Sequence, residues 1–155
     1  MWQAARAASG NEPDPHRIRR VQEKLDDPTA QLVLVGRGED TVGMALAEPF
    51  KQGDGMRTVR AGWGHISMVF VHPGHQGVGV GTELMKRLID GARWRHLSVW
   101  TRETNARARR LYRGSGFLPT GELGSLVGEP MQRWERLGRD GSAADHDAVG
   151  PPTRR

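Results

Sequence analysis

Hydrophobic residues near the start of the chain recur at the spacing of short helices. In residues 15–26, Ile18, Val21 and Leu25 lie three or four positions apart, with arginine and lysine between them, which is the pattern of one face of a helix. Residues 2–9 form a second helical piece, and a run rich in proline and polar residues separates the two. The chain is therefore expected to open with two short helices.

The pattern then changes to that of strands. Residues 32–35 form an apolar run, and residues 42–46 alternate apolar with small side chains, so the turn sequence between them predicts a β-hairpin. A glycine-rich loop is expected over residues 51–64, where its length suits a functional loop. Residues 65–71 are apolar on both faces, which is typical of a central strand in a sheet that is covered on both sides.

The second half of the chain alternates helices with strands. Amphipathic helices are predicted over residues 79–92 and 105–115. Strands are predicted over residues 96–101 and 131–137. Strands that alternate with helices in this way predict a mixed α/β domain.

Length and composition indicate one domain with a polar tail. The domain is expected to span residues 1–137, and residues 138–155 contain so few apolar side chains that we expect them to be disordered.

The chain has no cysteine, which excludes disulfides and thiolate metal ligands. The histidine spacing fits no standard zinc site, so no metal is expected. No apolar run is long enough to span a membrane, and no secretory signal is recognisable, so we expect a cytoplasmic protein.

Positive charge is concentrated in one part of the sequence. The chain has a net charge of +5, yet the segment from Lys86 to Arg113 alone carries nine lysines and arginines against Asp90 and Glu103. Solvated helix faces would account for this charge, and so would attraction to a polyanion. Because no nucleic-acid-binding motif occurs and the arginines are not interleaved with exposed aromatic residues, we expect a small phosphorylated ligand rather than nucleic acid.

Three glycines, Gly77, Gly79 and Gly81, occupy alternate positions just before the helix at residues 79–92. Glycine weakens strands and helices, so such a cluster needs a local reason. Neither the Walker loop nor the Rossmann fingerprint fits, because Gly81 is followed by Thr82 with no lysine and the glycine spacing differs. Bare amides at a helix N-terminus could hold a diphosphate that approaches the glycines closely. A tight turn that only packs the helix on the sheet is the alternative.

Two motifs carry a resemblance to a known family. VHPGHQGVGVGTELM, which begins at Val71, resembles the acyl-CoA-binding motif of the GNAT acyltransferase superfamily, V-x-P-x-x-Q/R-G-x-G-x-G/A. NARARRLYRGSGF, which begins at Asn105, resembles its second signature, N-x-x-A-x-x-L-Y-x-x-x-G-F. The two motifs occur in the family's order, separated by a helix and a strand, and the resemblance covers about residues 31–137.

The resemblance implies an α/β fold with a mixed sheet whose central strands splay apart. The family usually opens with a strand before its first helices; here the sequence leaves no room for one, so that strand is expected to be missing or the chain to start late. The implied activity is transfer of an acetyl group from acetyl-CoA to a primary amine by direct attack in a ternary complex. A non-catalytic module that senses acyl-CoA is the alternative.

By the same resemblance, the central strand would hold the pantetheine arm of acetyl-CoA along its backbone. The segment from Gln76 to Thr82, called the glycine bend below, would hold the diphosphate. Asn105 would cap the following helix or contact the pantetheine. The implied cofactor-binding residues are Met68, Val69, Val71, Gln76, Gly77, Val78, Gly79, Val80, Gly81, Thr82 and Asn105.

Tyr112, the only tyrosine, is the implied general acid for the leaving thiolate, since a phenol stays protonated at neutral pH. A core tyrosine on the helix stripe is the alternative.

Glu48 is the first candidate for the base that deprotonates the amine, and His65 and Glu103 are weaker ones. The acceptor is expected to be a small-molecule or peptide amine, shaped by the loop before the central strand. An unpaired sheet edge would also invite a homodimer.

Overall fold

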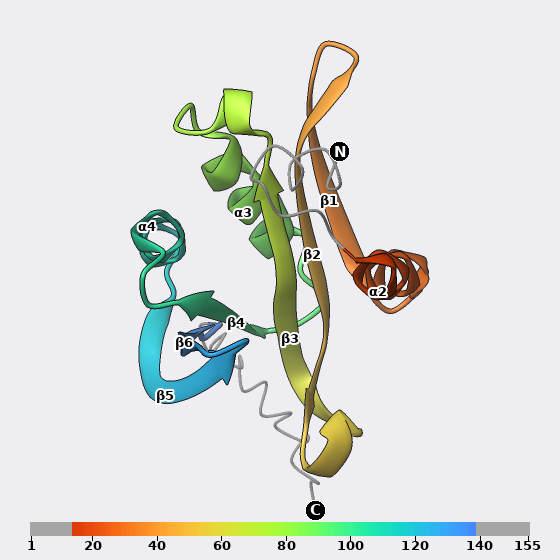
Figure 1. Cartoon of the computed structure of the whole chain (residues 1–155), viewed down its shortest axis with the longest axis vertical. Helices are drawn as coiled ribbons and strands as arrows, with labels where there is room; N and C mark the ends of the chain where they lie inside the picture. Colours follow the sequence, from red (N-terminus) through yellow and green to blue (C-terminus); the bar gives the residue numbers. More distant parts are fainter. Residues whose placement is uncertain (1–13, 139–155) are drawn as a thin grey trace, which may run out of the picture.

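The structure is a computed structural model that describes residues 14–138. One six-stranded sheet is flanked by three helices (Figure 1). The elements in chain order are α2 (Pro15–Asp26), β1 (Gln31–Arg37), β2 (Asp40–Gln52), the 3₁₀ turn η1 (Asp54–Met56), β3 (Thr58–Val71), the 3₁₀ turn η2 (Pro73–His75), α3 (Val80–Asp90), β4 (His96–Arg102), α4 (Ala106–Gly114), β5 (Leu118–Leu126) and β6 (Glu129–Arg136).

The sheet is mixed and opens at its middle. Its strand order is β1-β2-β3-β4-β6-β5, and only the β3–β4 pair is parallel. That pair is registered only from Trp63 to Ile66 of β3 and from His96 to Val99 of β4. Beyond these residues both strands continue without pairing to each other. The predicted fold class, a mixed α/β fold with a splayed central sheet, is confirmed.

Helix α3 covers one face of the sheet. Its buried residues Val80, Leu84, Met85 and Leu88 pack onto β2, where Gly43 leaves room for them. A Cβ atom on Gly43 would lie 2.8 Å from a methyl group of Val80 and 2.9 Å from one of Leu84. The helix therefore sits closer to the sheet than a larger residue in β2 would allow.

Most predicted elements occur where the pattern placed them. The helices over residues 15–26, 79–92 and 105–115 and the strands over residues 96–101 and 131–137 are present within a few residues of their expected ends. The hairpin and the central strand are also present, but β2 and β3 extend well beyond the expected bounds, to Gln52 and from Thr58. Residues 2–9 and almost all of the tail at 138–155 lie outside the described residues. The segment before α2, where the family usually has its first strand, lies outside the described residues, and β1 forms one edge of the described sheet. None of the described helices is long and apolar enough to cross a membrane.

The predicted loop over residues 51–64 is wrong. β2 and β3 run through most of it, with Lys51 opposite Val59 and Gln52 opposite Thr58, so only a short turn joins them. Gly53 and Gly55 have φ of +81° and +69°, which lets the chain reverse within this turn. The glycines thus allow a tight turn between two long strands, where the sequence suggests a long loop.

Candidate active site

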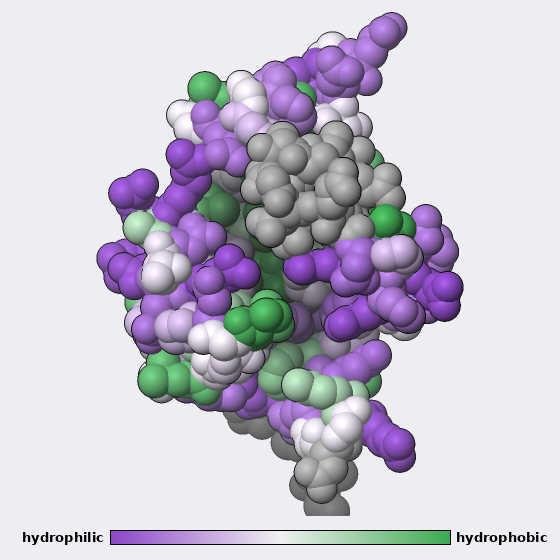
Figure 2. Space-filling view, viewed as in Figure 1, coloured by the Kyte–Doolittle hydropathy of each residue, from purple (hydrophilic) through white to green (hydrophobic). Residues whose placement is uncertain are grey.

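A cavity lies where β3 and β4 separate. Its volume is about 810 Å³, and it is lined by the unpaired ends of both strands, the glycine bend and α4, with further side chains from α2, β5 and β6. Figure 2 shows hydrophobic residues in the depth of the molecule between hydrophilic residues on either side. Elements that are distant in the sequence therefore meet at one hollow.

The cavity exposes a free edge of β3. On its other edge β3 stays paired with β2 as far as Val71. A register shift leaves Ser67 without a partner in β2, and its Oγ is buried with no hydrogen-bond partner among the described residues. The unpaired backbone of a strand can form hydrogen bonds with an extended ligand, as it would with another strand. Buried hydroxyl groups are nearly always hydrogen-bonded, so a bound ligand could supply the partner that Ser67 lacks. This edge therefore fits an extended amide-containing chain such as pantetheine.

The glycine bend presents backbone to the same cavity. Gly77 and Gly79 have φ of +77° and +89°, and Gly79 is the N-cap of α3 with no side chain capping the helix. A Cβ on either residue would meet nothing within 4 Å, so the bend is open. The first amides of α3 lack intrahelical partners and lie at the positive end of the helix dipole. Gly81 has another role, since a Cβ there would lie 3.3 Å from Leu111 of α4.

Charged side chains around the bend are arranged for an anion. Glu83, in the first turn of α3, accepts hydrogen bonds from Arg37 and Arg87 at 2.7 and 2.6 Å. The Arg37 hydrogen bond is the main cause that lowers the pKa of Glu83. Arg107 of α4 donates to the side chain of Gln76, whose Nε2 donates to the Val71 carbonyl at 3.2 Å. The one carboxylate of this turn is therefore neutralised by arginines.

Tyr112 of α4 lines the cavity although it is 6% exposed. Burial raises its pKa to about 12. Among the described residues its hydroxyl has no hydrogen-bond partner. Asn105, also in the lining, accepts from the Ala108 amide at 3.0 Å, so its role as helix cap is confirmed.

The three candidate bases do not line the cavity. Glu48 and His65 face each other across β2 and β3, one residue beyond the end of the β3 lining. Glu48 accepts a hydrogen bond from Lys24 of α2 at 2.6 Å, and His65 Nδ1 lies 3.0 Å from the Ser98 hydroxyl. Glu103 directly follows the end of β4, and its backbone carbonyl accepts a hydrogen bond from the Arg109 side chain at 2.9 Å.

The other predicted cofactor residues fall into two groups. The structure brings the side chains or backbone of most of them to the cavity, namely Met68, Val69, Val71, Gln76, Gly77, Gly79, Gly81, Thr82 and Asn105. Val78 is 68% exposed and Val80 is buried in the core, and neither lines the cavity. Their side chains are directed elsewhere, so only their amides are available to a ligand.

Several lining residues escaped the sequence analysis. Arg17, Ser67, Leu126 and Met131 line the cavity but belong to no recognised motif. A polar Ser67 in an otherwise apolar run was the one available signal. For Arg17, Leu126 and Met131 the sequence holds no such signal, because tertiary packing alone brings α2 and the β5–β6 hairpin to the site.

The buried histidine beside Glu48 should make stability depend on pH. Burial lowers the pKa of His65 to about 4; Glu48 opposes this shift, and Lys24 and Arg133 add to it. Between pH 6.5 and 4 the unfolded chain therefore binds a proton that the folded chain does not, so stability is complete above pH 6.5 and falls as the pH drops. We expect urea unfolding to show a loss of about 2–3 kcal/mol between pH 7 and 4.5 that is absent from His65→Gln. An equal loss in both proteins would contradict this assignment.

Comparison with known proteins identifies the family. Residues 1–117 match the acetyltransferase (GNAT) family. A Salmonella typhimurium L-methionine sulfoximine/L-methionine sulfone acetyltransferase is 44% identical over 69 residues, and the Escherichia coli L-amino acid N-acyltransferase MnaT is 41% identical over 69 residues. Each alignment covers 43% of this chain and 40% of the relative, so the matched segment spans well under half the length of these relatives.

Solved structures share the fold. The Salmonella typhimurium protein yncA, described as an acetyltransferase with its cofactor acetyl-CoA, has a TM-score of 0.66 at 24% identity, over 88% of this chain and 80% of that one. A ribosomal-protein-alanine N-acetyltransferase from Brucella melitensis has a TM-score of 0.65 at 23% identity, over 83% and 81%. Together with the match over residues 1–117, these likenesses establish that the chain belongs to the GNAT acetyltransferase family.

Proposed function

We propose that this protein is an N-acetyltransferase that moves an acetyl group from acetyl-CoA to the primary amine of a small molecule. The observation that carries the proposal is the separation of β3 from β4 beside the glycine bend, with Tyr112 in the same cavity. Two relatives named for L-methionine derivatives and L-amino acids support a small acceptor over a protein.

The residues of the cavity suit acetyl-CoA. The free backbone edge at Met68, Val69 and Val71 would hold the pantetheine arm, with the orphan hydroxyl of Ser67 close by. The diphosphate would rest on amides from Gln76 to Thr82, those of Val78 and Val80 included. Arg107, bonded to Gln76 from α4, adds positive charge at the bend.

The reaction forms one bond and breaks another. The neutral amine attacks the thioester carbonyl carbon, so a C–N bond forms, the C–S bond breaks, and CoA leaves as a thiolate. A backbone N–H near Met68 or Val69 would stabilise the negative charge that develops on the carbonyl oxygen. The acceptor nitrogen gives up two protons in all: one before the attack, when the ammonium becomes a neutral amine, and one after it, when the amide forms. The CoA thiolate takes up one of these protons, so one proton is released to solvent in each reaction.

Tyr112 would supply a proton, or a hydrogen bond, to the departing sulfur. Its pKa of about 12 keeps it protonated at any working pH. The same value makes the phenol a weaker acid than a thiol, so complete transfer to a free thiolate is uphill by about 3 pKa units. We therefore assign Tyr112 a hydrogen bond that strengthens as the C–S bond breaks, with the thiol proton replaced ultimately from the reacting amine.

Glu48 would take the ammonium proton through water, because its carboxylate lies outside the cavity lining and is bonded to Lys24. We expect Glu48→Gln to lower kcat/KM for the amine about tenfold at pH 7. The deficit should shrink as the pH approaches the pKa of the amine, since the acceptor then arrives already neutral. Steady-state rates from pH 6.5 to 9.5 measure this, and a deficit that does not depend on pH would remove the base role.

Thiol release tests the proposed function as a whole. Purified protein is incubated with acetyl-CoA and a panel of small primary amines, free CoA is followed with a thiol reagent, and the acetylated amine is identified by mass spectrometry. Amine-dependent release supports the enzyme. Tight acetyl-CoA binding without release for any amine would instead support the acyl-CoA sensor.

Two further expectations stay predictions. Fractionation of cells would test the cytoplasmic location. Light scattering of the purified protein would test the homodimer, for which β1 and β5 offer two sheet edges.

A further inference from the structure

The cavity opens on the face of the sheet opposite to α3. In β2, Gly43, Ala45 and Ala47 face α3, and side chains alternate along a strand, so Met44 and Leu46 face the other way. Their partners in β3, Phe70 and Met68, point to that second face with them. Helix α2 covers this face, since its Lys24 reaches Glu48. The second face is therefore the side from which an acceptor can enter if the diphosphate is held at the N-terminus of α3, as proposed above.

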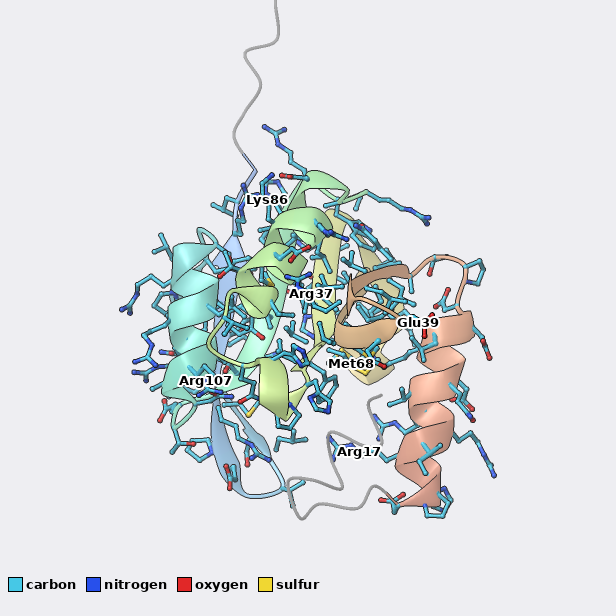
Figure 3. The ribbon with its side chains drawn as sticks, turned by 90° about the horizontal axis from the view of Figure 1, so that it is seen from above. Arg17, Arg37, Glu39, Met68, Lys86 and Arg107 are labelled. Carbon is cyan, nitrogen blue, oxygen red and sulfur yellow. The ribbon has the colours of Figure 1, made fainter. Side chains whose placement is uncertain are left out.

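One arginine of α2 extends into this side of the cavity. Figure 3 shows Arg17 pointing from α2 toward the middle of the molecule, with Met68 near the middle and Arg107 on the far side, on α4. Arg17 lines the cavity, and among the described residues its guanidinium forms no hydrogen bond or ion pair. An arginine held at a cavity without a partner offers a planar fork that matches a carboxylate.

Two of the three other arginines in the lining already have partners, and the third lies on a different helix from Arg17. Arg102 pairs with Glu129 at 3.3 Å, and Arg107 is bonded to Gln76 at the glycine bend. Arg110 lies on α4, beside Arg107 in sequence and away from α2. No aspartate or glutamate is among the described residues that line the cavity. An anion in the cavity would therefore meet no negatively charged side chain of the lining, and the nearest carboxylate along the helix is Asp14, which caps it.

Apolar side chains from four strands line the same cavity as Arg17. Met68 comes from β3, Trp100 from β4, Leu126 from β5 and Met131 from β6, and all four line the cavity. Leu126 is 49% exposed, so it offers apolar surface that a ligand can cover. A bound molecule that meets these groups and Arg17 at once combines an apolar side chain with a negative charge.

We infer that Arg17 binds the carboxylate of the acceptor, and that the acceptor is a free α-amino acid or close analogue with an apolar side chain. This rests on the proposed function, since it names the acceptor of the same site. The amine of such a molecule lies one carbon from its carboxylate, so binding at Arg17 would set where the amine points. Arg17 is thus a specificity residue and not a catalytic one.

Matched acceptors test the inference. Initial rates of thiol release are compared for L-leucine and 3-methylbutylamine, which differ only by the carboxylate, and for L-leucine methyl ester, which keeps its shape without the charge. We expect kcat/KM to be about 10- to 100-fold higher for L-leucine than for either molecule that lacks the carboxylate. Arg17→Gln should abolish that preference by lowering kcat/KM for L-leucine alone, and Arg17→Lys should retain part of it.

Controls separate this role from others. Arg20→Gln changes an exposed arginine of the same helix that does not line the cavity, so it should leave all three acceptors unaffected. Acetyl-CoA affinity should stay within about twofold of wild type in Arg17→Gln. Equal use of L-leucine and 3-methylbutylamine by the wild type, an equal loss for both in Arg17→Gln, or weakened acetyl-CoA binding would each overturn the inference.

A binding measurement without turnover distinguishes failure of the proposed acetyltransferase function from failure of the Arg17 carboxylate site. Calorimetric titration of L-leucine into CoA-saturated protein should show binding that Arg17→Gln weakens about tenfold or more. If thiol release fails for every amine while this binding persists, the proposed function is wrong and the carboxylate site stands. If CoA is released with amines that lack a carboxylate and L-leucine does not bind, the inference is wrong and the proposed function stands.

Discussion

Replacing Gly79 with aspartate should weaken acetyl-CoA binding at least about 100-fold. The residue is the N-cap of α3, and its φ of +89° turns the bend so that the first helical amides face the cavity. A carboxylate at this position would lie close to the bound diphosphate and repel it. Two like charges a few ångströms apart repel each other by several kcal/mol even in a partly solvated site. A loss of about 2.7 kcal/mol already corresponds to 100-fold in affinity.

Matched substitutions separate charge from backbone strain. A Cβ at position 79 would meet nothing within 4 Å, so the only structural cost is the positive φ. Gly79→Asn has nearly the same shape as Gly79→Asp and tolerates this φ, yet it carries no charge, and we expect it to lose about tenfold at most. Isothermal titration with acetyl-CoA gives the affinities. Wild-type affinity in Gly79→Asp would place the diphosphate somewhere other than this bend.

The central part of the fold was predictable because local pattern and tertiary role agree there. α3 has a full apolar stripe, and all four of its buried residues fall on it. The glycine motif also predicted an open bend at the N-terminus of α3, which the structure places at the cavity. Glu83 lies in the first turn, where it could have repelled a diphosphate, but it is bonded to Arg37 of β1, forty-six residues earlier. That contact depends on the hairpin packing beside α3 and could not be read from the motif.

Strand β5 shows why other parts were not predictable. All nine residues from Leu118 to Leu126 are exposed, so the strand has no buried face and no alternation of apolar with polar side chains. Pro119, Gly121 and Gly124 further lower its strand propensity. It forms because β6 supplies a paired edge, with Leu118 opposite Glu135 and Leu126 opposite Glu129. Pairing of this kind is a tertiary effect that no local pattern records.

The same limit applies to the site. The proposed cofactor side belongs to motifs that are continuous in the sequence. The proposed acceptor side is assembled from α2 and from β5 and β6, which follow α2 by about a hundred residues. Glu48 was a reasonable candidate from its place at the end of a predicted strand. Its contact with Lys24 and its position outside the lining follow from how α2 crosses the sheet.

Replacing Tyr112 with phenylalanine should lower kcat about 100-fold while acetyl-CoA affinity stays within about twofold. Positioned proton donors contribute at least this much to group transfer. The ring is buried beside Phe117, with ring centres 5.9 Å apart, and the hydroxyl has no partner among the described residues. Phenylalanine therefore keeps the packing and removes only the O–H group, so the folded state should be unharmed.

The pH profile then shows whether the hydroxyl acts on the leaving sulfur. Because the pKa of Tyr112 is about 12, its ionisation cannot cause any fall in wild-type rate below pH 11. The wild type and Tyr112→Phe should therefore keep a constant ratio of kcat from pH 6.5 to 9.5. If the tyrosine were only a core residue, the substitution would leave both the unfolding midpoint and kcat nearly unchanged, because phenylalanine keeps the packing of the ring. Unchanged turnover at full stability would mean that CoA departs as a thiolate, stabilised by the cavity without a donor from α4.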